Sequence, residues 1–259
     1  MKEYMQRPET ESDGMIEGRN AVTEALRSGT AIDKIYLAKG ETDRTLSRIA
    51  AEARKAGVVV VEADRRKLDA MSRTHAHPGV IALAAVREYV SVESMLAAAA
   101  EKGENPLLVV CDEISDPHNL GAIIRTAEAC GAHGVIIPKR HSAGLTAAAV
   151  KSSAGAAVCL PVVRVANLVS TMQQLKAEKN VWFTCADMDG QNWCQLDFKG
   201  AVGLVIGSEG SGVSRLVREE CDFVAALPMQ GQINSLNASV AGGIILYEIT
   251  RQRLGLKAK

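Results

Sequence analysis

Aromatic residues are scarce in this 259-residue chain, which contains only 3% Phe, Trp and Tyr. Modules that stack bases on aromatic platforms, such as an RNA-recognition-motif sheet or a single-strand-binding barrel, are therefore disfavoured. Net charge is also lacking, because 30 Lys and Arg balance 30 Asp and Glu. If a nucleic acid is the partner, local basic patches must bind it, since no overall field attracts it.

Long hydrophobic runs are missing as well. A membrane-spanning helix needs about 20 consecutive apolar residues. The best apolar stretches here, 107–110 and 201–206, are far shorter. The first residues, MKEYMQRPETESDG, are polar and of mixed charge, so we expect a frayed tail there and no secretory signal. These observations predict a cytoplasmic protein with no membrane partner.

Clustered cysteines are the third absence. No C-x-x-C or His/Cys cluster occurs, so we expect no metal site. An even number of cysteines allows a disulfide framework. The 47% hydrophobic fraction and the lack of an export signal favour reduced, partly buried thiols instead. The six cysteines are Cys111, Cys130, Cys159, Cys185, Cys194 and Cys221.

The length allows one large domain or two ordinary ones, and the pattern along the chain favours two. In the N-terminal part, apolar periodicity predicts a small α/β domain with helices at 19–27, 44–55 and 65–71 and strands at 34–38, 58–62 and 80–86. An alanine run at 97–100 and the helix-breaking EKGENP follow. We expect a tail at 1–14, a first domain at 15–88, a linker at 89–104, a second domain at 105–254 and a tail at 255–259.

The second domain alternates strands with helices. The pattern predicts strands at 107–111, 134–137, 157–160, 181–186, 203–206 and 223–227, and helices at 120–130, 145–152, 167–178, 214–219 and 235–253. Near-continuous apolar strands predict a parallel sheet that is covered on both faces. Ligands bind such a sheet beyond the carboxyl ends of its strands, so the loops there are the candidates for chemistry.

Two of these loops follow apolar strands directly. DPHNLGAIIRTAEACGAHG (116–134) places Asn119 at a turn and Arg125 six residues later, although a helix cap and a solvated arginine would explain them equally well. VIGSEGSGVSRLV (205–217) holds Glu209 among glycines in the order G-x-x-G-x-G. That order reverses the dinucleotide pattern and no P-loop lysine follows, so a plain glycine-rich turn is the alternative.

The third loop, ALPMQGQINSLNASVAGGIIL (226–246), runs from a strand end into a helix. Ser235, Asn237 and Ser239 are residues that ordinarily cap helix starts. Gly242 and Gly243 cost roughly 1 kcal/mol each against alanine inside a helix. They therefore predict a close approach of this helix to a neighbour.

NLGAIIRTA, IGSEGSG and SLNAS, in this order and spacing, closely resemble the three motifs of the SpoU/TrmH family of RNA 2′-O-methyltransferases in the SPOUT superfamily. The resemblance covers about residues 107–253. In the first domain, IEGRNAVTEAL and HPGVIAL resemble the substrate-binding domain of the bacterial 23S ribosomal RNA guanosine-2′-O-methyltransferase subgroup. The implied fold is an L30e-like α/β domain followed by an α/β catalytic domain with a parallel sheet and a C-terminal trefoil knot.

The resemblance also implies site residues, carried over position by position. It assigns catalysis to Asn119, Arg125, Glu209, Ser235 and Asn237, and binding of S-adenosylmethionine to Gly207, Leu227, Met229 and Leu236. The family's invoked base stands here at Arg125. Because a guanidinium normally stays protonated, we expect Arg125 to clamp a phosphate, with Glu209 as the alternative base or as a hydrogen-bonding residue. RNA contacts are expected at Lys139, Arg140, Arg65 and Arg66.

The leading hypothesis is therefore S-adenosylmethionine-dependent methylation of a ribose 2′-hydroxyl in RNA. The resemblance points to a guanosine of large-subunit (23S) ribosomal RNA, and to a homodimer whose active site is shared between subunits. Two alternatives remain open at this point. One is the same chemistry on transfer RNA, and the other is a non-catalytic RNA-binding or ribosome-assembly protein.

Overall fold

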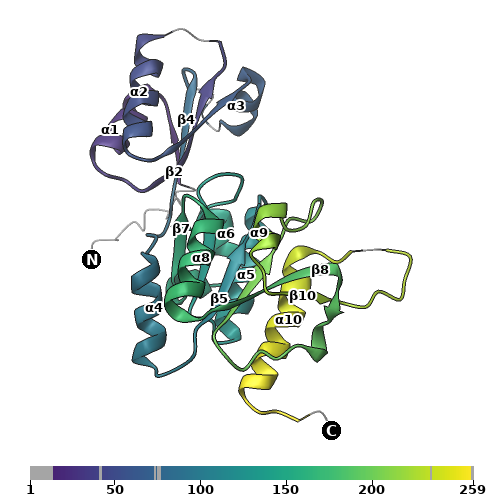
Figure 1. Cartoon of the computed structure of the whole chain (residues 1–259). Coiled ribbons are helices and arrows are strands. Elements are labelled where there is room, and N and C mark those ends of the chain that lie inside the picture. The colour runs from purple at the N-terminus through teal and green to yellow at the C-terminus, as the bar shows by residue number, and fades with distance from the viewer. Residues whose placement is uncertain (1–13, 41–42, 73, 75–76, 234, 258–259) are drawn as a thin grey trace, which may run out of the picture. The chain divides into compact units, whose positions relative to one another are not determined.

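The computed structural model describes residues 14–40, 43–72, 74, 77–233 and 235–257. The described residues form two compact units, with the division between Val86 and Arg87 (Figure 1). Unit 1 precedes this division, and unit 2 follows it. The expected tail at 1–14 lies outside the described residues except for Gly14, and so do residues 258 and 259 of the expected C-terminal tail. None of the described helices is long and apolar enough to cross a membrane.

Unit 1 is a four-stranded sheet covered by helices. In chain order its elements are β1 (Met15–Glu17), α1 (Arg19–Arg27), β2 (Ile32–Ala38), α2 (Arg44–Lys55), β3 (Val59–Ala63), α3 (Arg65–Met71) and β4 (Val80–Ala84). The strand order is β1-β4-β2-β3, with β2 and β3 parallel and β4 antiparallel to its neighbours. Val22 of α1 and Ile49 of α2 are fully buried against Ile35 of β2. The expected small α/β domain is confirmed, with β1 as an additional edge strand.

Unit 2 is built on a six-stranded parallel sheet of order β10-β8-β9-β5-β6-β7. Its strands are β5 (Leu107–Cys111), β6 (Gly134–Pro138), β7 (Val162–Val165), β8 (Trp182–Asn192), β9 (Val202–Ile206) and β10 (Phe223–Ala226). Its helices are α4 (Val92–Glu101), α5 (Pro117–Ala129), α6 (Ala147–Ser152), α7 (Ala156–Cys159), α8 (Leu168–Lys179), α9 (Arg215–Glu219), α10 (Ala238–Arg253) and the short 3₁₀ helix η1 (Trp193–Gln195).

Both faces of this sheet are buried, as the apolar strands predicted. In β5, Leu107, Val109 and Cys111 join the core beneath α5 and α10, whereas Leu108 and Val110 join a second core beneath α4 and α8. The alternation follows from the two-residue side-chain period of a strand. Burial raises the pKa of the Cys111 thiol to about 12, and all six cysteines are free. The trefoil knot that the resemblance implies stays a prediction.

The strand expected at 157–160 is wrong, because 157–159 belong to α7 and Leu160 follows as its C-cap. Short apolar runs do not distinguish helix from strand by periodicity, and the alanines here favour helix. The chain turns into α7 through Ala154 and Gly155, both at positive φ, of 48° and 94° respectively. Pro161 ends the helix, and the β-branched residues after it form β7.

Residues 89–104, expected as a linker, pack into unit 2. The Tyr89 hydroxyl accepts a hydrogen bond from Leu145 N at 2.9 Å, and Val90 forms a parallel bridge with Val163. Met95 of α4 is fully buried in the second core. This segment therefore covers one face of the sheet.

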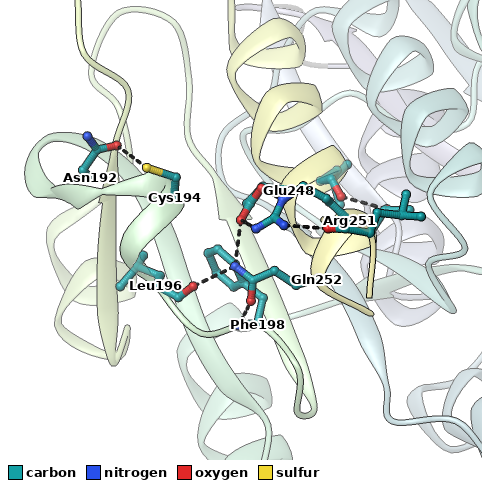
Figure 2. Close-up of polar contacts among 10 residues, drawn as sticks. Asn192, Cys194, Leu196, Phe198, Glu248, Arg251 and Gln252 are labelled. Carbon is teal, nitrogen blue, oxygen red and sulfur yellow. Dashed lines mark hydrogen bonds and ion pairs between the residues drawn. The ribbon is translucent and has the colours of Figure 1, made fainter. Parts of the chain in front are cut away.

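Helix α10 is held at both ends, by β9 near its start and by the segment between η1 and β9 near its end. Near its start, a Cβ on Gly242 would lie 2.3 Å from Ile206 Cδ1, so the close approach predicted for that glycine is present. Near its end, Gln252 accepts from Phe198 N and donates to Leu196 O, both at 2.8 Å (Figure 2). Arg251 and Gln252 both donate to the buried carboxylate of Glu248.

Candidate active site

Three side chains from the three motif loops meet in one hydrogen-bonded trio. Asn119 Nδ2 donates to Glu209 Oε1 at 3.1 Å, and Asn237 Nδ2 donates to Asn119 Oδ1 at 2.9 Å. Asn237 Nδ2 also donates to Glu209 Oε1. No described residue bonds the other carboxylate oxygen of Glu209. The trio therefore offers a fixed carboxylate with one oxygen available to a substrate.

Asn119 is placed by the start of α5. Asp116 caps this helix by accepting from His118 N at 2.9 Å, and Pro117 takes its first position, where a missing N–H costs nothing. A Cβ on Gly121 would lie 2.4 Å from Ala149 O, so only glycine lets α5 pack this closely on α6. Asn119 consequently projects from the first turn at the carboxyl edge of the sheet.

Glu209 is held by a tight loop after β9. Ser208 and Gly212 exchange two backbone hydrogen bonds of 3.0 and 2.9 Å, and Gly212 has a positive φ of 68°. The buried Asp112 accepts from Ser214 N at 2.7 Å and ties the end of the loop to β5. The loop thereby presents Glu209 toward the α5 and α10 starts.

Gly207 is required as glycine by the close return of its own loop. A Cβ there would lie 2.2 Å from the carbonyl carbon of Gly212 and 2.3 Å from Val213 N. Its φ is not in the positive region. The loop's own returning backbone therefore excludes a side chain at this position, and the conformation of Gly207 itself does not require glycine.

Asn237 serves both the helix and the trio. Its Oδ1 accepts from Ser239 N at 3.0 Å, from Val240 N at 3.3 Å and from Ser239 Oγ at 2.6 Å, which caps α10. Its Nδ2 remains for Asn119 and Glu209. An asparagine supplies one acceptor oxygen and two N–H donors, whereas an aspartate supplies no donor and a serine only one.

A cleft of about 300 Å³ lies beside the trio, within the usual range for small-molecule sites. The four residues assigned to the cofactor, Gly207, Leu227, Met229 and Leu236, all line it, as do Ser235 and Glu209. Among the described residues that line this cleft, the charged ones are Asp187 and Glu209, and none is basic. The cleft therefore suits a ligand that carries positive charge.

Arg125 is not brought to the trio within one chain. Because α5 begins at Pro117, Arg125 lies on its third turn. It is six residues beyond Asn119, which amounts to about 9 Å along the axis and a rotation of about 240°. Its side chain is exposed, and no hydrogen bond or ion pair joins it to a described residue.

The expected RNA contacts fall in both units. Lys139 and Arg140 follow β6 at the carboxyl edge of the sheet, with Arg140 exposed and Lys139 half-buried. Arg65 and Arg66 open helix α3 in unit 1, and both are exposed. The described residues contain no group of three or more side chains that could hold a metal ion.

Sequence reasoning missed one wall of the cleft. Ala186, Asp187 and Met188 line it from β8. The signal was present, because DMDG follows the apolar part of this strand as the other motif loops follow theirs. A second missed contact joins His118 Nδ1 and Ser152 Oγ at 2.9 Å, which links the first motif to α6.

The sequence matches two family descriptions and has close relatives. Residues 106–247 match the SpoU rRNA Methylase family, and residues 15–90 match the domain described as RNA 2′-O ribose methyltransferase substrate binding. A Bacillus subtilis (strain 168) protein named as a TrmH family tRNA/rRNA methyltransferase, YacO, is 43% identical over 91% of this chain and 94% of its own. A Mycobacterium sp. (strain KMS) protein named as an uncharacterized tRNA/rRNA methyltransferase is 43% identical over 97% of this chain and 81% of its own.

Solved structures show the same architecture. The SpoU methyltransferase AviRb from Streptomyces viridochromogenes, in complex with the cofactor AdoMet, has a TM-score of 0.60 at 27% identity and covers 97% of this chain and 95% of its own. An AdoMet-bound rRNA methyltransferase from Sinorhizobium meliloti has a TM-score of 0.56 at 25% identity and covers 94% of this chain and 88% of its own. This chain therefore belongs to the SpoU rRNA methylase family and is an RNA methyltransferase.

Proposed function

We propose that the protein transfers a methyl group from S-adenosylmethionine to a ribose 2′-hydroxyl of large-subunit ribosomal RNA in the cytoplasm. The observation that carries this proposal is the trio Asn119, Glu209 and Asn237 beside a cleft. Two carboxylates line this cleft, and none of its described lining residues is a lysine, arginine or histidine. A sulfonium and an ammonium group are both cations, so the charge of this cleft favours such a cofactor over an anionic nucleotide.

The cofactor would bind along Gly207, Leu227, Met229 and Leu236, whose backbone and apolar side chains line the cleft. When bound, S-adenosylmethionine supplies an electrophilic methyl group, which an oxygen nucleophile takes by in-line displacement. The chain's own task is to orient the 2′-hydroxyl on that line and to accept its proton. Asn119 and Asn237 hold Glu209 in place for this task.

Glu209 is the proton acceptor that we propose. Its Oε1 is occupied by two amide donors, while no described residue bonds its Oε2. The 2′-oxygen would lose its proton to the carboxylate as it takes the methyl group, and the bond between that methyl carbon and the donor's sulfur would break to leave a neutral thioether. Arg125 keeps its proton and binds an RNA phosphate, since a guanidinium offers a rigid fork of donors to phosphate oxygens.

We also propose that Arg125 acts in the site of a second copy, in a homodimer. Helix α10 exposes an apolar stripe of Val240, Ile244 and Tyr247, which are 50%, 36% and 59% exposed. Helix α5 packs on α10, with Thr126 facing Gly243, so the exposed Arg125 lies on the helix next to this stripe. Pairing of two such faces would cover the stripe and carry Arg125 to the neighbouring trio.

Unit 1 would select the RNA, with Arg65 and Arg66 as phosphate contacts, and Lys139 and Arg140 would bind backbone near the site. A guanosine of 23S RNA is the target that the motifs in unit 1 favour.

Mapping ribose methylation in ribosomal and transfer RNA of a strain that lacks the gene, and of the same strain complemented, tests this assignment. Loss and return of one 2′-O-methylguanosine in 23S RNA is expected, and loss of a mark in transfer RNA instead would contradict it.

A further inference from the structure

Strand β8 leaves its pairing with β10 beside the cofactor cleft. Val224 of β10 pairs with Cys185, but the next residue, Ala225, pairs with Gln191. Residues 186–190 of β8 therefore have no counterpart in β10 and bulge outward. A Cβ on Gly190 would lie 2.3 Å from Val224 O, so glycine is what allows the bulge to close against β10. We call residues 186–190 the β8 bulge.

The β8 bulge is held from outside by a single arginine of α9. Arg218 Nη1 donates to Asp187 Oδ2, and Arg218 Nη2 donates to Asp189 Oδ1 at 2.7 Å. The two carboxylates flank Met188, so one guanidinium fixes both sides of the bulge tip. The hydrogen bond from Arg218 lowers the pKa of Asp189, which agrees with an ion pair that is formed in the folded protein.

The same bulge forms a wall of the cleft. Ala186, Asp187 and Met188 line it together with the Gly207 loop and the segment before α10. Met188 is 64% exposed, so its side chain is open to a ligand that enters the cleft. Its two neighbours in the chain are held by Arg218, and Met188 itself lines the cleft.

Charge gives Arg218 a second effect on the cleft. Glu209 is bonded by the neutral amides of Asn119 and Asn237 and stays uncompensated, while Asp187 is paired with a guanidinium. Removal of Arg218 would leave Asp187 unpaired at the wall and free the bulge from α9. The wall of the cleft would then be less rigid and would carry a more negative charge.

We propose that Arg218 is a positioning residue for the methyl donor: its two ion pairs hold the β8 bulge so that Asp187 and Met188 form the wall against which S-adenosylmethionine packs. The proposal rests on the proposed function in so far as this cleft is the cofactor site. Arg218 touches neither the trio nor the cleft itself, so its effect should reach cofactor affinity and leave the chemical step unchanged.

Arg218→Ala tests this inference in the full-length protein. We expect the Kd for S-adenosylmethionine, measured by calorimetry, to rise at least tenfold, while kcat at saturating cofactor and KM for RNA stay within about twofold of wild type. Arg218→Lys should restore part of the affinity, because one ammonium cannot bridge both carboxylates. Asp189→Asn removes the one ion pair of Arg218 whose carboxylate does not line the cleft. We expect this variant to raise the Kd by an intermediate amount.

Arg215→Ala is the matched control. Arg215 lies on the same helix, but its ion pair is with the exposed Glu219, and neither residue reaches the bulge. Its Kd should equal that of wild type. A purely structural role for Arg218 would lower the melting temperature and leave the Kd of the folded protein unchanged, and that outcome overturns the inference. Failure of the wild-type protein to bind S-adenosylmethionine would overturn the proposed function as well.

Discussion

Asn237 donates a hydrogen bond to Asn119 at 2.9 Å across 118 positions of the chain. This contact joins the start of α10 to the start of α5, and both residues add a bond to Glu209 from the loop after β9. Each of the three motif loops therefore contributes one member to the trio. The geometry of the trio depends on the parallel sheet, which brings the carboxyl ends of β5 and β9 to the same edge.

Asn237→Asp separates the two tasks of this residue. The carboxylate keeps the cap of α10, because aspartate and asparagine are equally good N-caps. It cannot donate to Asn119 or Glu209, and it places a second negative charge beside Glu209. We expect methyl transfer to fall by roughly 10²-fold, the size typical of losing one preorganised donor, with an unchanged melting temperature. Asn237→Ala should lose about 1 kcal/mol of stability as well. Full activity of Asn237→Asp would remove the trio from the mechanism.

Gly207→Ala tests why that position is glycine. Its Cβ would meet the backbone of Gly212 at 2.2 Å, so the loop must shift, at a cost of about 1–3 kcal/mol. We expect a lower melting temperature together with a strong loss of affinity for S-adenosylmethionine. Gly210→Ala is the control, because it lines the same cleft and its Cβ would have no neighbour within 4 Å. Equal behaviour of the two variants in thermal unfolding and calorimetry would contradict this account of the loop.

Much of the fold could be predicted from periodicity and turn residues. The helices at 19–27, 44–55 and 65–71 have the expected bounds, and the alternating apolar strands implied the two-faced parallel sheet. The segment 157–160 could not be assigned, because an apolar run of four residues fits a helix as well as a strand. Its state depends on Pro161 and on the positive φ of Gly155, and only the folded chain shows the latter.

The candidate site also contains residues that could be predicted from the sequence and residues that could not. Asn119, Glu209 and Asn237 could be named because each stands in one of the three motifs that resemble those of the SpoU/TrmH family. The ion pairs of Arg218 with the β8 bulge could not be predicted. Arg218 and Asp187 are 31 positions apart and meet only through the break in register between β8 and β10. The position of Arg125 depended on where α5 begins, and helix ends are the least certain feature of a sequence pattern.

Glu248 should make stability depend on pH in a defined direction. The hydrogen bonds from Arg251 lower the pKa of this buried carboxyl below its ordinary value of 4.5 (Figure 2). A carboxyl whose pKa is lower in the folded state stabilises the fold above its unfolded pKa, and this contribution is lost as the pH falls through the folded pKa. Glu248→Gln should therefore cost about 1–3 kcal/mol at pH 7 and progressively less below the ordinary carboxyl pKa.

Thermal unfolding of wild type and Glu248→Gln, measured from pH 7 down to below the ordinary carboxyl pKa of 4.5, tests this expectation. Glu219→Gln serves as the control, since its ion pair with Arg215 is exposed and should contribute little. A difference between wild type and Glu248→Gln that does not change with pH would show that the Glu248 charge has no part in holding α10 to the segment at 196–198.

Mixing two inactive variants tests the shared active site. Arg125→Ala and Glu209→Gln should each lose methyl transfer, but a mixed dimer would hold one site with both wild-type residues. If subunits exchange freely, activity should return to about a quarter of the wild-type value. Mixed dimers that form, as native mass spectrometry would show, and yet remain inactive would place Arg125 and Glu209 in the same subunit's site.

The central claim is that the trio and its cleft place a methyl group on a ribose oxygen. Unmethylated 23S ribosomal RNA would be incubated with the protein and isotope-labelled S-adenosylmethionine, digested to nucleosides and analysed by mass spectrometry. The account predicts the label on the ribose of 2′-O-methylguanosine, and its absence with Glu209→Gln. Label on a nucleobase, or equal ribose label with Glu209→Gln, would contradict it.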